Sequence, residues 1–410
     1  MLSINGDLLL SHIRALGAIG IDGEGRRIRL AASDTEKAGR DAVVGWMKEL
    51  GLEVVVDRIG NIFGIWSTEE NKAEAPVMIG SHIDTVINAG QYDGCYGTLA
   101  SIEVVRTLME AGVKPRRPIA IGVFTNEEGV RYAPDMMGSL VYAGGYPLET
   151  ALATVGTDGT ILGAELERIG YGGTVEPGFL KPHCFLELHI EQGPILDVEG
   201  TPIGAVENLQ GISWQRVTIE GLANHAGTTP TAMRIDAGLA AAKVITFLRD
   251  RCNASGGKTV ATVGCMEFFP NAINVIPSRA VFTVDVRNPN EEKLCEEEAA
   301  LAAYLEELAA SDKVKISTER LVRFEPVLFD EGIVSAVEKA ASARSLACRR
   351  ITSGAGQDAQ MIARMCPTAM IFVPSVNGIS HNPQEFTKDA DLVAGANVFC
   401  DVVRELCEAE

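Results

Sequence analysis

The sequence predicts an α/β protein in which a smaller α+β domain is inserted into a domain built on a mostly parallel β-sheet. Four strand-like segments are almost continuously apolar, and helical patterns separate them. Such strands are typical of a parallel sheet that helices cover on both faces, because neither face meets water. An alternating apolar and polar pattern between residues 211 and 325 predicts the inserted domain.

The first domain is expected to span residues 1–210 and 326–410. Its predicted helices include Leu8–Leu16 and Gly39–Leu50, and its predicted strands are Leu52–Val56, Ile62–Trp66, Val77–Ile79, Pro118–Phe124, Phe185–Leu188 and Ala369–Val373. Ligands of such sheets bind outside the carboxyl ends of the strands. The polar segments that follow the last four strands are therefore candidate site segments.

The inserted domain, residues 211–325, is predicted to have the order βαββαβ. The expected elements are strand Ser213–Glu220, helix Asp236–Leu248, strands Val260–Phe269 and Ala280–Val286, helix Glu291–Leu308 and strand Val314–Thr318. This order is typical of a ferredoxin-like split βαβ arrangement.

Composition excludes some classes of function. The net charge of −19 argues against nucleic-acid binding, because a phosphate backbone requires a basic surface. The nine cysteines form no CxxC pair, which favours a reducing compartment. Neither a secretory signal nor an apolar stretch of about 20 residues is present, so we expect a cytoplasmic protein without a membrane span.

Five residues of metal-binding type lie in short glycine-containing motifs. Three of the six histidines of the chain fall in these motifs, and a fourth, His225, lies in the glycine-containing segment Gly221–Pro230. The five candidates are His82 in Gly80–Thr85, Asp93 in Tyr92–Gly97, Glu128 in Thr125–Gly129, His189 in Leu188–Gly193 and His381 in Gly378–Pro383. Imidazole and carboxylate ligands suit zinc, manganese, cobalt or nickel, and the carboxylate of Asp93 can bridge two cations.

Asp84 and Glu127 are expected to support this chemistry without binding metal. Asp84 lies two residues after His82, so its carboxylate can orient the imidazole through the second ring nitrogen. Glu127 and Glu128 follow an apolar strand, and adjacent side chains there point in different directions. One glutamate can bind metal while the other acts as general base toward water. Taken alone, two glutamates in a solvated turn would be the simpler interpretation.

The inserted domain holds three further candidates. His225, in Gly221–Pro230, can donate a hydrogen bond to an oxyanion, although a structural histidine at a helix entry is the alternative. Asn274 supplies an amide, and Arg287 ends a strand with a guanidinium that can hold a carboxylate through two hydrogen bonds. As an isolated residue, Arg287 could equally be an ordinary surface arginine.

These motifs resemble the hydantoinase/carbamoylase-type amidases, which comprise N-carbamoyl-L-amino-acid hydrolases, β-ureidopropionases and allantoate amidohydrolases. The similarity runs from about Gly39 to Ala394. Its most specific pieces are Gly80–Thr85, His189–Gly193, Asn224–Pro230, Asn274–Pro277 and Phe372–Pro383. This group is part of a superfamily of zinc aminoacylases and carboxypeptidases that pair a catalytic α/β domain with a lid domain.

The resemblance implies a role for each site residue. One metal would be held by His82 and His189, the other by Glu128 and His381, and Asp93 would bridge them. Glu127 would be the general base, and the lid domain would form a homodimer in which His225 reaches the neighbouring active site. The implied substrate contacts are Gln192, His225, Asn274, Arg287, Gly356 and Gln357.

The expected reaction is hydrolysis of the C–N bond of a carbamoyl or ureido group on a carboxylate-bearing substrate. An N-carbamoyl-L-amino acid is the first choice, and allantoate or N-carbamoyl-β-alanine is the alternative. A dipeptidase or aminoacylase of the same superfamily, and a metal-binding module without activity, are the competing hypotheses. Gln357 stands where the family usually has histidine, and Ala205–Gln210 also departs from the pattern; both bear on the substrate.

Overall fold

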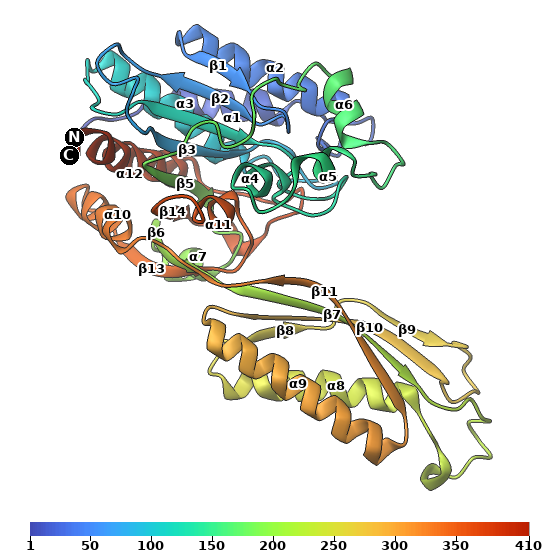
Figure 1. The fold of residues 1–410 in the computed structure, drawn as a ribbon. Helices are drawn as coiled ribbons and strands as arrows, with labels where there is room; N and C mark the ends of the chain where they lie inside the picture. The colour runs from blue at the N-terminus through green and yellow to red at the C-terminus, as the bar shows by residue number, and fades with distance from the viewer. Residues whose placement is uncertain (410) are drawn as a thin grey trace. The chain divides into compact units, whose positions relative to one another are not determined.

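The computed structural model describes residues 1–409. Parallel strands, among them β3, β5 and β14, form the centre of its larger sheet (Figure 1). The sheet has the order β1-β2-β4-β3-β5-β14-β6-β12, and β13 pairs with β6. Strands β4, β3, β5 and β14 are parallel neighbours, whereas β1, β2 and β6 pair antiparallel at the sides. The bounds are β1 Glu53–Val56, β2 Ile62–Trp66, β3 Val77–His82, β4 Ile119–Phe124, β5 Cys184–Ile190, β6 Ile203–Leu209, β12 Val327–Leu328, β13 Cys348–Ser353 and β14 Thr368–Val373.

Helices cover both faces of this sheet, as the contacts of β5 show. A Cβ on Gly395 of α12 would lie 3.5 Å from the Leu188 side chain, whereas the Glu187 carboxylate accepts the N–H of Ala359 in α11. Consecutive side chains of a strand point to opposite faces, so α12 and α11 lie on opposite sides. The helices are α1 Gly6–Gly17, α2 Asp34–Glu49, α3 Cys95–Glu110, α4 Met137–Tyr142, α5 Leu148–Leu152, α6 Leu162–Arg168, α7 Ile195–Glu199, α10 Glu331–Ala343, α11 Asp358–Ile362 and α12 Asp389–Glu408, with a 3-10 turn, η2, at Val376–Gly378.

The mostly parallel α/β fold predicted from the apolar strands is thus found. All residues of β3, β4, β5 and β14 are buried, as their sequences require. Side-chain caps help to define the helix starts: Ser33 accepts the N–H of Glu36 in α2, and Asp330 accepts that of Ile333 in α10. None of the helices within residues 1–409 combines the length and apolar composition that a membrane span requires.

The chain divides into two compact units. The first comprises Met1–Glu207 and the segment from Leu328 onward, and the second is Asn208–Val327. The second unit contains β7 Gly211–Glu220, η1 Thr231–Met233, α8 Ala237–Ala254, β8 Val260–Thr262, β9 Met266–Phe269, β10 Arg279–Asn288, α9 Glu291–Asp312 and β11 Lys315–Phe324.

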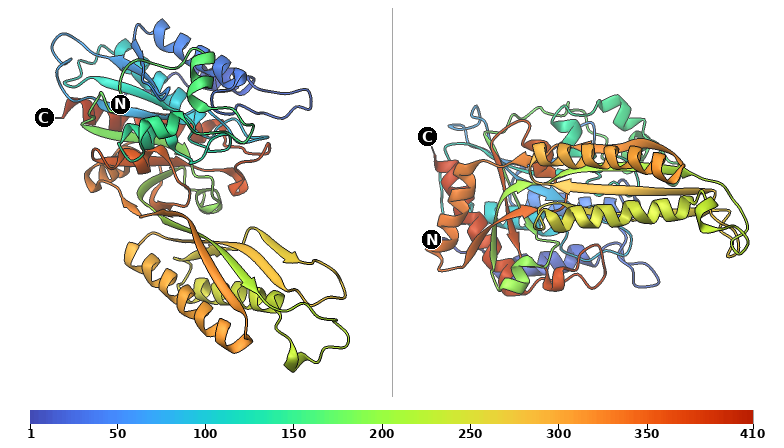
Figure 2. Two further views of the ribbon diagram at one scale, coloured as in Figure 1. Left: turned by 45° about the vertical axis from the view of Figure 1, so that its right-hand side comes forward. Right: turned by 90° about the horizontal axis from the view of Figure 1, so that it is seen from below.

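An antiparallel sheet of order β11-β7-β10-β8 forms one layer of the second unit, with β9 also paired to β10. Helices α8 and α9 lie side by side on one face (Figure 2). Val217, Phe282 and Leu301 belong to the buried core between the helices and the sheet. The rings of Phe247 and Tyr304 stack 4.1 Å apart and join the two helices.

One predicted element of this unit was wrong. The expected continuous strand Val260–Phe269 is two strands, β8 and β9, which pair with different parts of β10. Between them, Gly264 lies in open space and the Cys265 carbonyl accepts the N–H of Thr283 outside the regular ladders. The alternating pattern continues through the interruption because both flanking segments keep their pairing with β10.

Candidate metal centre

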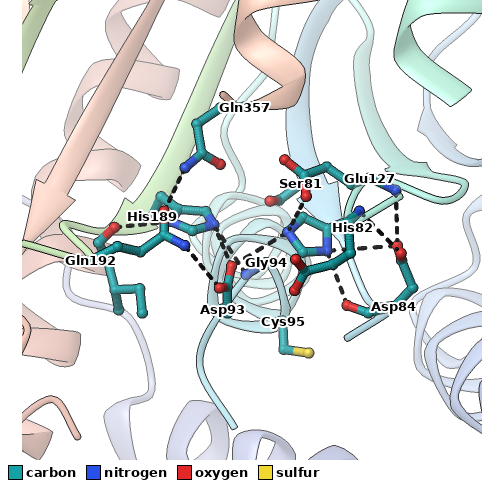
Figure 3. Close-up of polar contacts among 12 residues, drawn as sticks. Ser81, His82, Asp84, Asp93, Gly94, Cys95, Glu127, His189, Gln192 and Gln357 are labelled. Atoms are coloured by element: carbon teal, nitrogen blue, oxygen red, sulfur yellow. Dashed lines mark hydrogen bonds and ion pairs between the residues drawn. The ribbon is translucent and has the colours of Figure 1, made fainter. Parts of the chain in front are cut away.

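The candidate metal ligands gather at the carboxyl ends of the parallel strands. His82 ends β3, Glu128 follows β4, His189 lies near the end of β5, and His381 is in the loop after β14. Asp93 immediately precedes Gly94 and α3, whose start lies behind the site in Figure 3. Strand order therefore brings together residues that are far apart in the sequence.

Asp93 lies between two groups of ligands and directs one carboxylate oxygen to each. Its Oδ1 is 3.5 Å from His82 Nε2 and 3.2 Å from His189 Nε2. Its Oδ2 is 3.1 Å from His381 Nε2, which is also 3.3 Å from Glu128 Oε2. His82, Asp93 and His189 thus form one possible metal-binding group, and Asp93, Glu128 and His381 form a second. The grouping is the one that the resemblance implies.

Main-chain contacts orient the two buried imidazoles. His82 Nδ1 lies 3.1 Å from the carbonyl oxygen of Asp84, and His189 Nδ1 lies 2.9 Å from that of Ile190. A carbonyl only accepts, so each Nδ1 carries the proton. Each neutral ring then presents the Nε2 lone pair toward Asp93, as metal ligands do. The N–H of Gly94, which donates to His189 Nε2 at 3.1 Å, agrees with this tautomer.

The residues fit a pair of divalent cations. His82 Nε2 is buried and has no hydrogen-bond partner within the part of the chain that the structure describes, so a lone pair there is unsatisfied without an ion. The carboxylates also crowd together: burial, together with Asp93, raises the pKa of Glu128 to about 8. Burial also raises the pKa of Asp93, but the imidazoles of His189, His381 and His82, which can donate to it only when they are protonated, outweigh burial and hold that pKa well below its ordinary value. Cations would neutralise this concentration of negative charge.

Glu127 lies beside the first group. Its Oε2 is 3.4 Å from His82 Nε2, whereas Glu128 turns to His381. The two glutamates therefore point to different groups, as predicted for adjacent residues at a strand end. Burial raises the pKa of Glu127 well above its ordinary value, and the nearby carboxylates raise it further.

Asp84 acts differently from the sequence-based expectation. Its carboxylate Oδ1 is 3.7 Å from His82 Nδ1, farther than its own carbonyl oxygen. The carboxylate instead accepts the N–H groups of Glu127 and Glu128, each at 3.2 Å, as Figure 3 shows for Glu127. Asp84 thus holds the imidazole through its main chain and the glutamates through its side chain.

Gly94 permits the close approach of α3 to His82. A Cβ at this position would lie 2.3 Å from His82 Nε2, and φ is +62°. We expect Gly94→Ala to displace the imidazole and to lower the metal content, measured by elemental analysis of the purified protein. Gly112→Ala is the matched control, because φ is +67° there and no atom lies within 4 Å. Equal metal content in both variants would contradict a steric role for Gly94.

A chain of two amides reaches Asp93 from the other side. Gln192 Nε2 donates to Asp93 Oδ2 at 2.9 Å, and Gln357 Nε2 donates to Gln192 Oε1 at 2.7 Å (Figure 3). A carboxylate only accepts, so Asp93 sets the direction of both hydrogen bonds. Gln357 is buried and its Oε1 has no partner among the described residues, while the adjacent Gly356 is half-buried against Met136.

Two buried glutamates near the site were not predicted from the sequence. Glu187 accepts the hydroxyl of Ser81 at 2.7 Å and the N–H of Ala359 at 2.9 Å, next to β3 and α11. Glu385 contacts the segment that contains Asp93. A charged residue inside the apolar run Phe185–Leu188 was a signal for Glu187, because a strand buried on both faces seldom contains an unpaired carboxylate.

His225 and Asn274 are neighbours within the second unit, on two exposed loops. The N–H of Ala226 donates to the Asn274 carbonyl, and the main chain of His225 forms an isolated antiparallel β-bridge with that of Val275. His225 Nδ1 accepts the N–H groups of Gly227 and Thr228 at 3.0 and 3.2 Å. A neutral ring then carries its proton on Nε2, so this nitrogen is a hydrogen-bond donor.

Arg287 has a partner that sequence reasoning missed. Its guanidinium donates to the carboxylate of Asp285 three times, at 2.9–3.1 Å. Residues two apart on a strand share a face, so the spacing was the available signal. Arg287 is therefore held in a defined orientation within β10.

Comparisons with known proteins identify relatives along the whole chain. The family model described as "Peptidase family M20/M25/M40" matches residues 78–405. An N-carbamoyl-L-amino-acid amidohydrolase of Rhizobium meliloti is 38% identical over 99% of this chain and 97% of its own length. A solved amidase of the hydantoinase/carbamoylase family from Burkholderia multivorans is 40% identical and has a TM-score of 0.95, covering 100% of this chain and 99% of its own.

Other relatives have different names. An allantoate amidohydrolase of Bacillus subtilis is 32% identical over 97% of this chain and 97% of its own length. A ureidoglycolate hydrolase of Arabidopsis thaliana is 36% identical over 90% of this chain and 80% of its own length. The fold, the paired ligand groups and these matches all indicate a metal-dependent hydrolase. The chain belongs to peptidase family M20/M25/M40 and, within it, is a hydrolase similar to the hydantoinase/carbamoylase amidases.

Proposed function

We propose that the protein hydrolyses N-carbamoyl-L-amino acids to the free amino acid, ammonia and carbon dioxide. The observation that carries the proposal is Asp93 between two ligand groups, with Glu127 beside one of them. The similarity to proteins named N-carbamoyl-L-amino-acid amidohydrolase supports the substrate class. Water adds to the carbamoyl carbon, the bond to the amino-acid nitrogen breaks, and the released carbamate decomposes to ammonia and carbon dioxide.

Two divalent cations, zinc in our proposal, would be held by the two groups that share Asp93. When bound, they supply Lewis-acid activation of the carbonyl oxygen and of water. The neutral imidazoles of His82 and His189 and the carboxylates of Asp93 and Glu128 are ligands that zinc accepts. Metal content of the protein as purified, and recovery of activity after chelation with each of zinc, manganese, cobalt and nickel, would test the identity.

Glu127 would move the proton. Its carboxylate would take a proton from the attacking water and return it to the leaving nitrogen, and burial, which raises its pKa, makes it a stronger proton acceptor than an ordinary glutamate. The Asp84 carboxylate accepts the N–H of Glu127 and so holds the main chain of Glu127 in place. Positioning of this kind keeps the carboxylate near the reacting atoms.

The remaining contacts would orient the substrate. We assign the Nε2 hydrogen of His225 to the developing oxyanion, in keeping with the tautomer set by Gly227 and Thr228. Arg287 would bind the substrate carboxylate, with Asn274 and Gln192 supplying amide contacts. Gln357 would act through Gln192, because its Nε2 is already bonded to that side chain. Gly356 leaves room beside them.

Ammonia release from a substrate panel would test the proposal. We expect the metal-loaded protein to release ammonia from N-carbamoyl-L-amino acids and more slowly from allantoate, ureidoglycolate and N-carbamoyl-β-alanine. Dipeptides and N-acyl-L-amino acids, assayed for free amine, are the parallel arm. Free amine from this arm alone would place the protein among the peptidases or aminoacylases, and no turnover by a metal-loaded protein would leave a binding module.

We also propose a homodimer through the second unit and a cytoplasmic location. The resemblance supports the dimer, and nine unpaired cysteines agree with a reducing compartment. Sedimentation equilibrium of the protein as purified should give twice the mass of one chain, and a monomer would exclude a site shared between subunits.

A further inference from the structure

Glu385 joins two loops that carry ligands of the candidate metal centre. It lies four residues after His381, and it is only 6% exposed. Its Oε1 accepts the N–H of Tyr92 at 3.0 Å and that of Asp93 at 3.3 Å. One side chain from the loop after β14 therefore holds the main chain of Asp93 from across the sheet.

The second carboxylate oxygen of Glu385 holds its own loop. Oε2 accepts the hydroxyl of Ser380 at 2.9 Å, and that hydroxyl also lies 3.4 Å from Asp93 Oδ2. Ser380 precedes His381, whose φ of +53° is a strained conformation for a residue with a Cβ. Contacts on both sides are needed to keep such a residue in place.

The packing around Glu385 is specific to this arrangement. A Cβ on Gly90 would lie 2.1 Å from Glu385 Oε1, so only glycine leaves space for the carboxylate there. The rings of Tyr92 and Phe386 also meet edge to face, with centroids 6.4 Å apart. The two loops are thus joined at neighbouring positions, and Glu385 supplies the side-chain oxygen that accepts the main-chain N–H groups of Tyr92 and Asp93.

We infer that Glu385 is a positioning residue for the second metal-binding group, formed by Asp93, Glu128 and His381. It fixes the main chain at Asp93 and, through Ser380, the start of the His381 segment. The first group has its own main-chain supports at Asp84 and Ile190. Loss of Glu385 should therefore weaken the second group more than the first. This inference rests on the proposed metal centre.

Metal stoichiometry is the direct test. The apoprotein is titrated with Co²⁺ and bound metal is counted by elemental analysis, while visible absorption reports the environment of each ion. We expect two equivalents for the unaltered chain and one tight equivalent for Glu385→Ala, with the second weakened by roughly 10–100-fold. The spectrum of the remaining ion should match that of His381→Ala and differ from that of His82→Ala.

Two further variants separate positioning from general loss of structure. Glu385→Gln keeps an oxygen for both N–H groups and can bond Ser380, so it should retain most of the second metal. Glu191→Ala removes a comparably buried carboxylate that accepts the N–H groups of Ile195 and Leu196, each at 2.8 Å, and should bind two equivalents.

Three outcomes would overturn the inference. These are two tight equivalents in Glu385→Ala, a matching loss in Glu191→Ala, and loss of the ion held by His82 instead of the ion held by His381. If the unaltered chain itself bound no metal, the proposed metal centre would fail and not only the role of Glu385.

Discussion

Glu127→Gln should lower kcat by roughly 10²–10⁴-fold, the usual range for removal of a general base. The substituted amide keeps the size of the side chain but cannot accept the proton of the attacking water. KM should change little, because Glu127 is assigned to proton transfer and not to substrate binding. Steady-state ammonia release at saturating N-carbamoyl-L-amino acid would measure the effect.

Metal content is the control for this variant. Glu127 belongs to neither three-residue ligand group, so Glu127→Gln should still hold two equivalents. Loss of metal together with activity would instead make Glu127 a ligand. Unchanged turnover with both metals present would remove it from the mechanism.

Asp93→Ala should remove metal from both groups and reduce activity to background. Oδ1 faces His82 and His189, and Oδ2 faces His381, and among residues 1–409 Asp93 is the one side chain that both ligand groups share. Elemental analysis after equilibration with limiting metal would show stoichiometry falling from two toward zero. His381→Ala, which affects the second group alone, should keep one equivalent.

The volume-matched variant Asp93→Asn refines this expectation. One amide oxygen can still face a single group, while the amide nitrogen cannot bind a cation, so at most one equivalent should remain tight. If Asp93→Ala retained two tight equivalents, the metals would be independent of Asp93 and the shared-carboxylate geometry would be wrong.

The strands and the ligand types could be predicted because both depend on local sequence. Continuous apolar runs identify strands buried on both faces, as the buried segments β3, β4, β5 and β14 show. Polar motifs directly after such runs must lie at one edge of a parallel sheet. His82, Asp93, Glu128, His189 and His381 were candidates because they lie in short glycine-containing motifs, most of them after such runs, and the fold gathers them.

Tertiary structure decided which ligand faces which. The strands occur in the chain as β3, β4, β5 and β14 but lie in the sheet as β4-β3-β5-β14, so His82 is next to His189, about a hundred residues away. The two oxygens of Asp93 serve different groups only because of that order. The fold also decided the hydrogen-bond partners of two side chains. The Asp84 carboxylate accepts the main-chain N–H groups of Glu127 and Glu128, and Gln357 donates to Gln192.

Glu385 and Arg287 show most clearly the difference between what the sequence determined and what only the tertiary structure decided. The sequence by itself determined the fold class, and it named the candidate ligands and the candidate base, because these rest on local patterns of burial and polarity and on short motifs. Only the folded chain showed that Glu385 holds the N–H groups of Tyr92 and Asp93, and that Asp285 holds Arg287. The Glu385 contacts join segments 293 and 292 residues apart in the chain, and they depend on distances through space that no local pattern in the sequence encodes. The spacing of Asp285 and Arg287 puts both on one face of a strand, but only the folded chain established the hydrogen bonds between them.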